Sequence, residues 1–263
     1  TAFTCSVVIN AIKKLRLKPT YVDIDHKTLG TSYFDLKKKI TKKTKALMLI
    51  HVLGTCADMT EIEKLCKKYN LFLIEDTCES MGAKWDGRKV GTFGEVSTFS
   101  SYYSHHICTL EGGLTCFREN SDMEIAESIR SHGWLRHLNK HDEIFKEYSQ
   151  LDPSFLFNYV GYNLRLSEPQ AAIGIEQLKQ LNLFIKHRSK AANLYTEFFN
   201  NFQDLFKFIK PKDKAQSSWF GFPMVLTGNL KGKRNDLRLR LLENNIESRP
   251  FLAGDFTIQP VVN

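Results

Sequence analysis

Two adjacent histidines, His105 and His106, follow an apolar run over residues 96–103 whose composition is typical of a β-strand. A short loop and the sequence EGG at residues 111–113 then lead into a second apolar run over residues 114–117. Imidazole is the side chain that transfers protons near neutral pH, and paired glycines let a ligand approach the backbone closely. This spacing indicates a strand end that presents a proton-transfer group to a bound ligand.

Acidic side chains follow another apolar run, at residues 71–74. This run ends on Glu75 and Asp76, and Glu79 would lie on the same side as Asp76 if the chain turns helically there. An aspartate at the end of a buried strand is commonly a cap or an ion-pair partner. A carboxylate in a half-buried site also favours a cation beside it, such as a protonated ring nitrogen. Asp76 is therefore open to a structural role or to a role in binding a cationic ring.

The elements that would position these groups alternate between short apolar strands and amphipathic helices. We predict strands at residues 19–25, 46–53, 71–74 and 96–103, a hairpin-like connection at 82–94, and helices at 6–17, 34–40, 58–69 and 122–132. This alternation is typical of an α/β fold with a mainly parallel sheet and right-handed crossovers. Ligands bind at the carboxyl ends of the strands in such sheets, so the polar segments 51–54, 75–79 and 100–106 should converge.

The second half of the chain changes its pattern twice. Residues 133–157 are charged and aperiodic, which predicts a mobile loop, and residues 167–185 predict a strong helix with Ser167 as its N-cap. Then come patterns for a helix at 188–200, a strand at 217–226, a helix at 235–244 and a strand at 246–249. We predict a large domain at 1–185, with 167–185 as connector helix, and a smaller α+β domain at 186–263.

The ends and the composition limit the kind of protein. The sequence begins at Thr1 and ends within an apolar pattern, so we expect a fragment that lacks its N-terminal part, with its C-terminal end left open. The net charge of +8 lies on lysine-rich faces such as 37–43. We interpret it as solvated surface or as a match for an anionic small substrate; nucleic acid binding is disfavoured because no interleaved aromatics or known module occur.

The hydropathy and the cysteine spacing indicate in which environment the protein works. No apolar run reaches the ~18–20 residues that would cross a bilayer, so we expect no membrane segment. All six cysteines lie within the first 116 residues without a CxxC spacing, which favours a reducing, cytoplasmic environment over a disulfide scaffold. We expect no metal site, because the spacing of these cysteines does not match the usual ligand patterns.

Several segments, taken together, resemble the sugar-modifying branch of the pyridoxal phosphate (PLP) enzymes of fold type I, the DegT/DnrJ/EryC1/StrS family. The resemblance rests on EDTCESMGA at 75–83, GRKVGTFG at 87–94, the segment from Phe99 to EGG, and GYNLR at 161–165 followed by QAAIG. Each motif is weak alone, but the set is specific and covers nearly the whole chain. It implies the PLP-dependent transferase fold type I.

The family resemblance also implies roles for residues. Asp76 would pair with the pyridine nitrogen of PLP, and Glu79 would lie near the ring or its 3-hydroxyl. Ser100 would bind the phosphate. Asn163 would reach the cofactor phosphate of a neighbouring subunit, which implies a homodimer with shared active sites. Relatives place an aromatic residue over the cofactor ring near Cys5, and whether a thiol replaces it is open.

The sequence departs from the family pattern at His105. Family aminotransferases carry their Schiff-base lysine six residues before the glutamate of EGG, and imidazole cannot form an imine with an aldehyde. One interpretation is an inactive PLP-binding paralogue, and another is a nucleotide-sugar 4-aminotransferase that uses a different lysine, such as Lys84 or Lys89. The third, which we favour, resembles the family's 3-dehydratases of nucleotide-linked 4-keto-6-deoxyhexoses, which carry a similar His-His-Ile-Thr sequence before EGG.

The dehydratase interpretation explains the replacement. A lysine would recapture the aldehyde form of the cofactor and favour transamination, whereas a histidine only relays protons and leaves pyridoxamine 5'-phosphate (PMP) to work. One such subtype uses an iron–sulfur cluster and needs late cysteines, but none follows Cys116. The other regenerates PMP with L-glutamate; its common example acts on GDP-4-keto-6-deoxymannose in deoxysugar biosynthesis. We therefore expect PLP/PMP, glutamate and a nucleotide sugar, and no iron–sulfur cluster.

Three further residues are candidates for substrate contact. Tyr102 would hold the substrate or orient the base, although a plain strand aromatic explains it equally well. His106 stands behind the base. Arg249, in the segment ESRPFLAGDF, resembles a dehydratase motif and could grip a nucleotide phosphate bidentately, or be a surface arginine.

Overall fold

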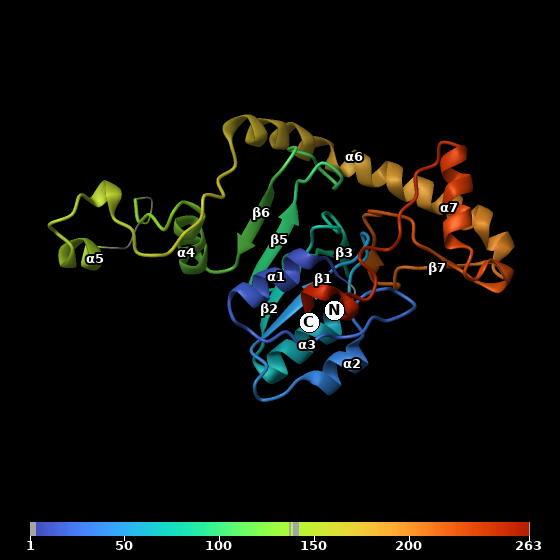
Figure 1. The fold of residues 1–263 in the computed structure, drawn as a ribbon, viewed down its shortest axis with the longest axis horizontal. Helices are drawn as coiled ribbons and strands as arrows, with labels where there is room; N and C mark the ends of the chain where they lie inside the picture. Colours follow the sequence, from blue (N-terminus) through green and yellow to red (C-terminus); the bar gives the residue numbers. More distant parts are fainter. Residues whose placement is uncertain (1–3, 137, 139–141, 263) are drawn as a thin grey trace.

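The computed structural model describes residues 4–136, 138 and 142–262, and these form an α/β fold (Figure 1). The elements up to residue 130 are, in chain order, α1 (Ser6–Lys14), α2 (Tyr33–Lys39), β1 (Ala46–Ile50), α3 (Met59–Tyr69), β2 (Phe72–Asp76), β3 (Lys84–Trp85), β4 (Arg88–Lys89), β5 (Val96–Ser100), β6 (Gly113–Phe117) and α4 (Asn120–Arg130). The later elements are α5 (Asp142–Glu147), η1 (Pro153–Phe155), α6 (Glu168–Phe199), η2 (Asn200–Phe202), β7 (Phe206–Phe208), β8 (Ala215–Gln216), β9 (Met224–Leu226), η3 (Gly228–Leu230), α7 (Arg234–Glu243), η4 (Phe256–Ile258) and η5 (Pro260–Val262).

The central sheet has the strand order β1–β2–β5–β6. The first three strands run parallel, and β6 is antiparallel to β5, to which a loop joins it directly. The register places Asp76 opposite Ile50 in β1 and opposite Thr98 in β5. The carboxyl ends of three parallel strands therefore meet at one edge of the sheet, as the sequence pattern predicted.

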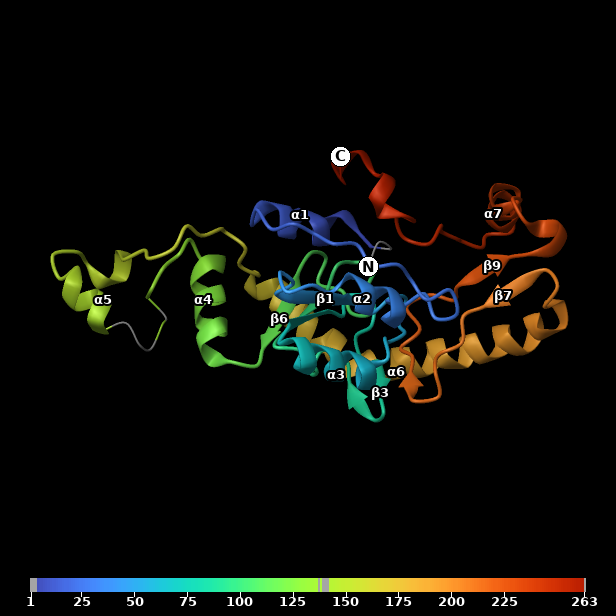
Figure 2. The same cartoon turned by 90° about the horizontal axis from the view of Figure 1, so that it is seen from below.

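Both faces of the sheet are covered, which explains the continuous apolar run of β1. Leu47 and Leu49 pack into a core with α2 and α3, whereas Ile50 and the partly buried Met48 pack with α1 and η4. Successive side chains of a strand point to opposite faces, so a strand covered on both sides needs apolar residues at every position. Figure 2 shows α1 above the sheet and α3 below it.

The described residues between 131 and 166 form an arm that extends away from the sheet beyond α4, and the part of the predicted loop at 137 and 139–141 lies outside the described residues (Figure 1). The sequence predicted an irregular loop at 133–157, and this prediction was wrong in part. The arm contains α5 and η1 and has its own apolar cluster, built on Leu135, Leu138 and Leu156. A long charged stretch separates Leu135 and Leu138 from Leu156, so no continuous helical or strand period runs through the segment, and the pattern did not reveal the cluster.

A single helix, α6, runs for 32 residues. Its start agrees with the prediction, because Ser167 and Gln170 form a capping box and Pro169 lies in the first turn. The predicted division into helices at 167–185 and 188–200 was wrong. No glycine or proline interrupts residues 175–199, so nothing in the backbone chemistry ends the helix between them.

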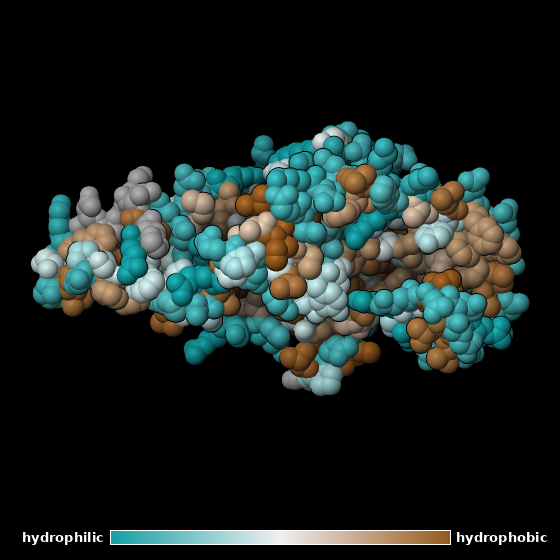
Figure 3. Space-filling view, turned by 90° about the horizontal axis from the view of Figure 1, so that it is seen from above, coloured by the Kyte–Doolittle hydropathy of each residue, from teal (hydrophilic) through white to brown (hydrophobic). Residues whose placement is uncertain are grey.

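The chain after α6 packs against the C-terminal half of that helix through aromatic rings. Their centroids lie 5.1–6.4 Å apart in a chain of contacts that joins Tyr195, Phe198, Phe199, Phe202, Phe206, Phe208, Trp219 and Phe222. Such offset and edge-to-face pairs add to the energy of area burial. Figure 3 shows apolar side chains gathered at the corresponding, right-hand end of the molecule.

Two predicted strands are absent and three are shorter than expected, since β1 and β5 already end at Ile50 and Ser100. Residues 19–25 contribute only an isolated bridge from Ile24, residues 246–249 form no strand, and the 217–226 strand is reduced to β9. The start of the 217–226 segment does not pair with another strand, because the Ser218 N–H donates to the Gly54 carbonyl at 2.8 Å. β8 pairs with β3, so the later part of the chain is also joined to the earlier part by a three-stranded sheet.

The domain boundary after residue 185 stays a prediction, since α6 continues through it. Within the described ranges, none of the helices combines the length and apolar character that crossing a membrane requires.

Candidate active site

Asp76 is the last residue of β2, at the sheet edge where three strands end. Its Oδ1 atom accepts a hydrogen bond from the backbone N–H of Cys78 at 3.1 Å, which fixes the carboxylate at the start of the following turn. Asp76 is half-buried, and a carboxylate in such a position can stabilise a cation bound at the carboxyl ends of the strands.

Glu79 lies in the turn after β2 and comes close to Asp76. The backbone N–H of Leu53, three residues after β1, donates to Glu79 Oε2 at 2.9 Å. Burial and the negative charge of Asp76 raise the pKa of Glu79 to about 7, although the Leu53 hydrogen bond opposes this. Glu79 can therefore gain or lose a proton near neutral pH, as a group involved in proton transfer must.

The loop between β5 and β6, residues 101–112, carries both histidines and is closed at its base by hydrogen bonds. The Ser101 N–H donates to the Gly112 carbonyl at 3.0 Å, and the hydroxyls of Ser101 and Thr109 lie 2.6 Å apart. Gly112 has a φ of +148°, and a Cβ there would come within 2.8 Å of both hydroxyls. The glycine of EGG is thus required by close packing at the base of the loop.

Helix α6 supports the same loop from the side. The Gln170 amide donates to the Glu111 carbonyl at 2.8 Å, and Gln177 Oε1 accepts from the Cys108 N–H at 3.3 Å. These contacts explain why the QAAIG helix and the EGG loop occur together in this sequence: the helix fixes the loop that carries the histidines.

His105 is half-buried and lies near Asp76. Burial lowers the pKa of His105, and the charge of Asp76 opposes that shift, which brings the two predicted site residues together. Its ring centroid is 5.9 Å from that of Tyr102 and 5.2 Å from that of Phe220. A neutral imidazole beside a carboxylate is a suitable general base near neutral pH.

His106 is enclosed, with 2% of its surface exposed. Burial, with the positive charge of Arg188 as the next cause, lowers the pKa of His106 to about 4. Its ring centroid lies 5.6 Å from that of Phe220. This burial argues against the substrate contact that the sequence suggested for His106, because the imidazole presents almost no surface to a ligand.

Ser100 and Tyr102 lie where the sequence predicted them, at the end of β5. Ser100 Oγ accepts a hydrogen bond from the Tyr102 N–H at 3.2 Å. Tyr102 is 36% exposed and contacts Tyr103 edge to face, with ring centroids 4.5 Å apart. Both groups are thus available to a ligand at the edge formed by Asp76 and His105.

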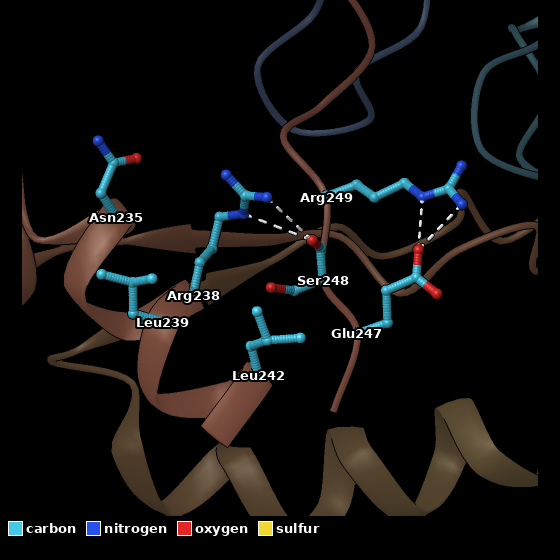
Figure 4. A pocket seen from close by; sticks show the side chains of 7 residues that line it. All are labelled: Asn235, Arg238, Leu239, Leu242, Glu247, Ser248 and Arg249. Carbon is cyan, nitrogen blue, oxygen red and sulfur yellow. Dashed lines mark hydrogen bonds and ion pairs between the residues drawn. The ribbon is translucent and has the colours of Figure 1, made fainter. Parts of the chain in front are cut away.

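Arg249 approaches this edge from the C-terminal segment. Its Nε and Nη2 atoms donate to Glu247 Oε1 at 3.0 and 2.9 Å. The hydrogen bond and charge of Glu247, with a smaller contribution from Tyr103, raise the pKa of Arg249, so the guanidinium lies within electrostatic reach of Tyr103. Figure 4 shows the Arg249 side chain pointing away from α7.

A surface hollow of about 600 Å³ lies beside Arg249, between α7 and the segment that follows it (Figure 4). Its walls are Asn235, Arg238, Leu239, Leu242, Glu247, Ser248 and Arg249. Asp76 and His105 do not line this hollow. Arg249 therefore links two surfaces, the hollow on α7 and the tyrosines of the histidine loop.

Asn163 and Cys5 lie on other elements than Asp76 and His105. Asn163 lies on the arm, where it forms an isolated bridge with Ser131 and its Oδ1 accepts from Arg165 Nε at 3.3 Å. Cys5 is exposed at the N-cap of α1. Their predicted roles, toward a neighbouring subunit and over a cofactor ring, stay predictions.

One residue beside the site was not singled out from the sequence. Glu75 is fully buried, and its two oxygens accept the backbone N–H groups of Gly91, Phe93 and Gly94 at 2.7–2.8 Å. It thereby ties the turn before β5 to β2. The alternation of side chains along a strand could have predicted this structural role for Glu75. Adjacent residues of β2 face opposite sides of the sheet, so Glu75 and Asp76 cannot both face one ligand.

The described residues contain no group of three or more His, Cys, Asp or Glu side chains arranged to hold a metal ion.

A parallel sheet covered by helices, with a carboxylate at one strand end and a proton-transfer group at the next, defines a class: the structure has the α/β fold of the PLP-dependent aminotransferases. The chain belongs to the DegT/DnrJ/EryC1/StrS aminotransferase family, whose sequence profile matches residues 1–263.

Several of the similar proteins within this family are named as sugar 3-dehydratases. The chain is 39% identical over 260 residues to GDP-4-keto-6-deoxy-D-mannose 3-dehydratase of Yersinia pseudotuberculosis, covering 97% of this chain and 65% of that protein. The E. coli enzyme of that name, solved with bound hydrated PLP, is similar with a TM-score of 0.89 and 36% identity, over 99% of this chain and 67% of that one. Another solved GDP-4-keto-6-deoxymannose-3-dehydratase, with a trapped PLP-glutamate geminal diamine, gives a TM-score of 0.87 and 36% identity over 97% and 66% of the two chains.

Proposed function

We propose that this chain belongs to a PLP/PMP-dependent dehydratase acting at C3 of a nucleotide-linked 4-keto-6-deoxyhexose, with L-glutamate as amino donor. The observation that carries the proposal is His105, which stands beside Asp76 where family aminotransferases have a lysine. The names of the Yersinia and E. coli relatives support GDP-4-keto-6-deoxymannose as the substrate. The chain spans 65% of the Yersinia relative's length, so the proposal concerns an activity to which this part contributes.

The residues at the sheet edge fit a phosphorylated pyridine ring. Asp76 offers a half-buried carboxylate for a protonated ring nitrogen, and Glu79 lies beside it. Ser100 offers a hydroxyl at the end of β5 that could bond a phosphate oxygen. We assign Asp76, Glu79 and Ser100 to cofactor binding, and Asn163 to the cofactor of a neighbouring subunit in a homodimer.

When bound, the cofactor would supply an amine and an electron-withdrawing ring. The chain would supply the proton transfer: neutral His105, beside Asp76, can accept a proton on its imidazole and return it to a departing hydroxyl. Burial favours the neutral imidazole, which is the form a base requires. Tyr102, exposed beside His105, is placed to contact the sugar, and Arg249 is placed to contact a phosphate of the nucleotide.

A relocated lysine is the main alternative, and the family's description as aminotransferases favours it. Lys84 and Lys89 pair with each other across the β3–β4 hairpin, in a different sheet from the one that carries Asp76. Neither therefore takes over the position of the Schiff-base lysine.

We also propose that the protein is cytoplasmic and that it helps to supply deoxysugars for lipopolysaccharide O-antigen, which agrees with a nucleotide-sugar substrate.

The test is a product assay. The protein with PLP, L-glutamate and GDP-4-keto-6-deoxymannose should release ammonia and form a 3-deoxy-4-keto sugar, and His105→Asn should not. A 4-amino sugar as the only product would reject the dehydratase and support the aminotransferase. Borohydride reduction followed by peptide mapping would then locate the lysine that holds PLP.

A further inference from the structure

Buried polar atoms without a hydrogen-bond partner gather behind His105. Among the described residues, partners are lacking for His105 Nδ1, both ring nitrogens of His106, Arg188 Nη1 and Ser218 Oγ. His106 and Ser218 are 2% and 0% exposed. Buried polar atoms in native proteins are almost always paired, directly or through an ordered water. The carbonyls of Tyr102 and Ser218 lie close enough to the rings of His105 and His106, respectively, to favour their protonated forms, and the remaining atoms of the group still call for a partner.

The four side chains are neighbours, although they come from three parts of the chain. The charges of Arg188 and His105 act on His106, and the Ser218 carbonyl lies close enough to His106 to favour its protonated form slightly. Phe220, two residues after Ser218, contacts both imidazoles. The cluster thus lies between the histidine loop, α6 and the segment before β9.

The donor and acceptor types in the cluster match one molecule that both donates and accepts. Arg188 Nη1 is a donor, and His105 Nδ1 is a donor when the proton of the neutral ring is on that nitrogen. Neutral His106 offers an acceptor nitrogen, and the Ser218 hydroxyl can accept. A water molecule makes two to four such hydrogen bonds, whereas a halide can only accept and would leave the His106 acceptor unpaired.

We propose that an internal water occupies this cluster and accepts a hydrogen bond from His105 Nδ1, held there by His106, Arg188 and Ser218. This bond fixes the Nδ1–H tautomer of His105 and leaves Nε2 unprotonated. His106 is then a positioning residue that acts on the base through the water, in the way a third group orients the base of a catalytic triad. The catalytic consequence rests on the proposed dehydratase, but the tautomer and the water do not.

Among the described residues, the charged or titratable side chains next to the pair include Asp76, Arg188 and Tyr102, whose ring centroid lies 5.9 Å from that of His105. Asp76 faces His105 from β2, and Arg188 faces His106 from α6. Burial, and after it the charge of Arg188, keeps His106 neutral, so its acceptor nitrogen persists across the neutral pH range. The orientation of His105 should therefore not change with pH until His105 itself is protonated.

Nitrogen-15 NMR of histidine-labelled holoenzyme tests the tautomer without any turnover. His105 should give the Nδ1–H pattern in the wild type. In His106→Phe the pattern should become a mixture, with the pKa of His105 moved by about 0.5 units or more. His187→Phe is the matched control, since His187 is exposed and adjoins Arg188 on α6, and it should change neither. An Nε2–H pattern in the wild type would overturn the proposal.

A crystal structure of the wild-type holoenzyme keeps the proposal testable even where a variant fails to fold. Electron density for a water within hydrogen-bond distance of His105 Nδ1 and of two of the other three side chains supports it. A crystal soaked in sodium bromide separates water from a halide, and an anomalous bromide peak at the cluster would contradict it. Because neither measurement involves the sugar, a failure here is distinct from a failure of the product assay.

Discussion

His51 Nε2 lies 3.0 Å from Glu75 Oε2, and both side chains are fully buried. His51 directly follows β1, and Glu75 precedes Asp76 on β2. The Ala57 N–H points at His51 Nδ1 at 3.4 Å, so Nδ1 acts as acceptor and Nε2 gives its proton to Glu75. Burial opposes the ionisation of Glu75, but His51 and the N–H groups of the 91–94 turn outweigh it and lower the pKa of Glu75. The pair therefore fixes the two sheet strands and the turn on which the site is built.

Glu75→Gln should destabilise the protein strongly. The amide keeps the shape of the carboxylate but points an NH₂ group at backbone N–H donors that need an acceptor. Breaking a buried, hydrogen-bonded pair in this way costs about 3–5 kcal/mol. Urea unfolding followed by circular dichroism measures the free energy of unfolding.

The control for that variant is Glu63→Gln, which removes an exposed ion pair with Arg88 at 3.0 Å. Exposed pairs of this kind contribute roughly 0–1 kcal/mol. Equal losses from the two variants would show that the buried position of Glu75 carries no special stabilisation.

Glu79→Gln should change how stability depends on pH. A carboxyl group whose pKa is raised on folding, here from 4.5 to about 7, contributes stability below pH 4.5 that is lost as the pH rises through 7. Glutamine keeps an oxygen for the Leu53 N–H but cannot ionise. Relative to the wild type, the variant should therefore gain about 2–3 kcal/mol between pH 4.5 and pH 8. Parallel stability curves across this range would show that the pKa of Glu79 is not raised.

The sequence was sufficient for the parts of the site that local pattern determines. Asp76 and His105 could be placed at neighbouring strand ends, because apolar runs locate strands and parallel strands align their carboxyl ends. Phe220 and Ser218 could not be predicted beside His106, since their contact spans more than a hundred residues and depends on how the chain after α6 packs. The continuity of α6 was missed for the opposite reason: a change of composition near residue 186 looked like a boundary, although no helix-breaking residue occurs there.

Gly54→Ala should loosen the segment that contains Ser218 and Phe220 from the sheet. Gly54 has a φ of +86°, and a Cβ there would lie 2.4 Å from the backbone nitrogen of Trp219. Backbone atoms cannot yield as a side chain can, so overpacking should add about 1–3 kcal/mol of destabilisation to the cost of the strained φ. The fluorescence of Trp219 should change as well, because this indole contacts the aromatic cluster through Phe222.

Gly87→Ala is the matched control for Gly54→Ala. Gly87 has a similar φ of +79°, but nothing lies within 4 Å of a Cβ at that position. It should show the cost of the backbone conformation alone, about 1–2 kcal/mol. If both variants lose the same stability and leave tryptophan fluorescence unchanged, the segment does not depend on close approach at Gly54.

His105→Lys should convert the chain from one that binds PLP reversibly to one that binds it covalently. A lysine amine at this position, beside the Asp76 carboxylate, can form an imine with the aldehyde of PLP, which imidazole cannot. Borohydride reduction should then attach PLP to the peptide that contains residue 105, as detected by mass spectrometry, and formation of the 3-deoxy sugar should fall by at least about 10²-fold because the proton relay is lost. His105→Asn serves as the comparison, since it removes the base without adding an amine and should bind PLP only reversibly. If the lysine variant stays unlabelled while Lys84 or Lys89 is labelled in the wild type, the site of the chemistry lies on the β3–β4 hairpin and not at the end of β5.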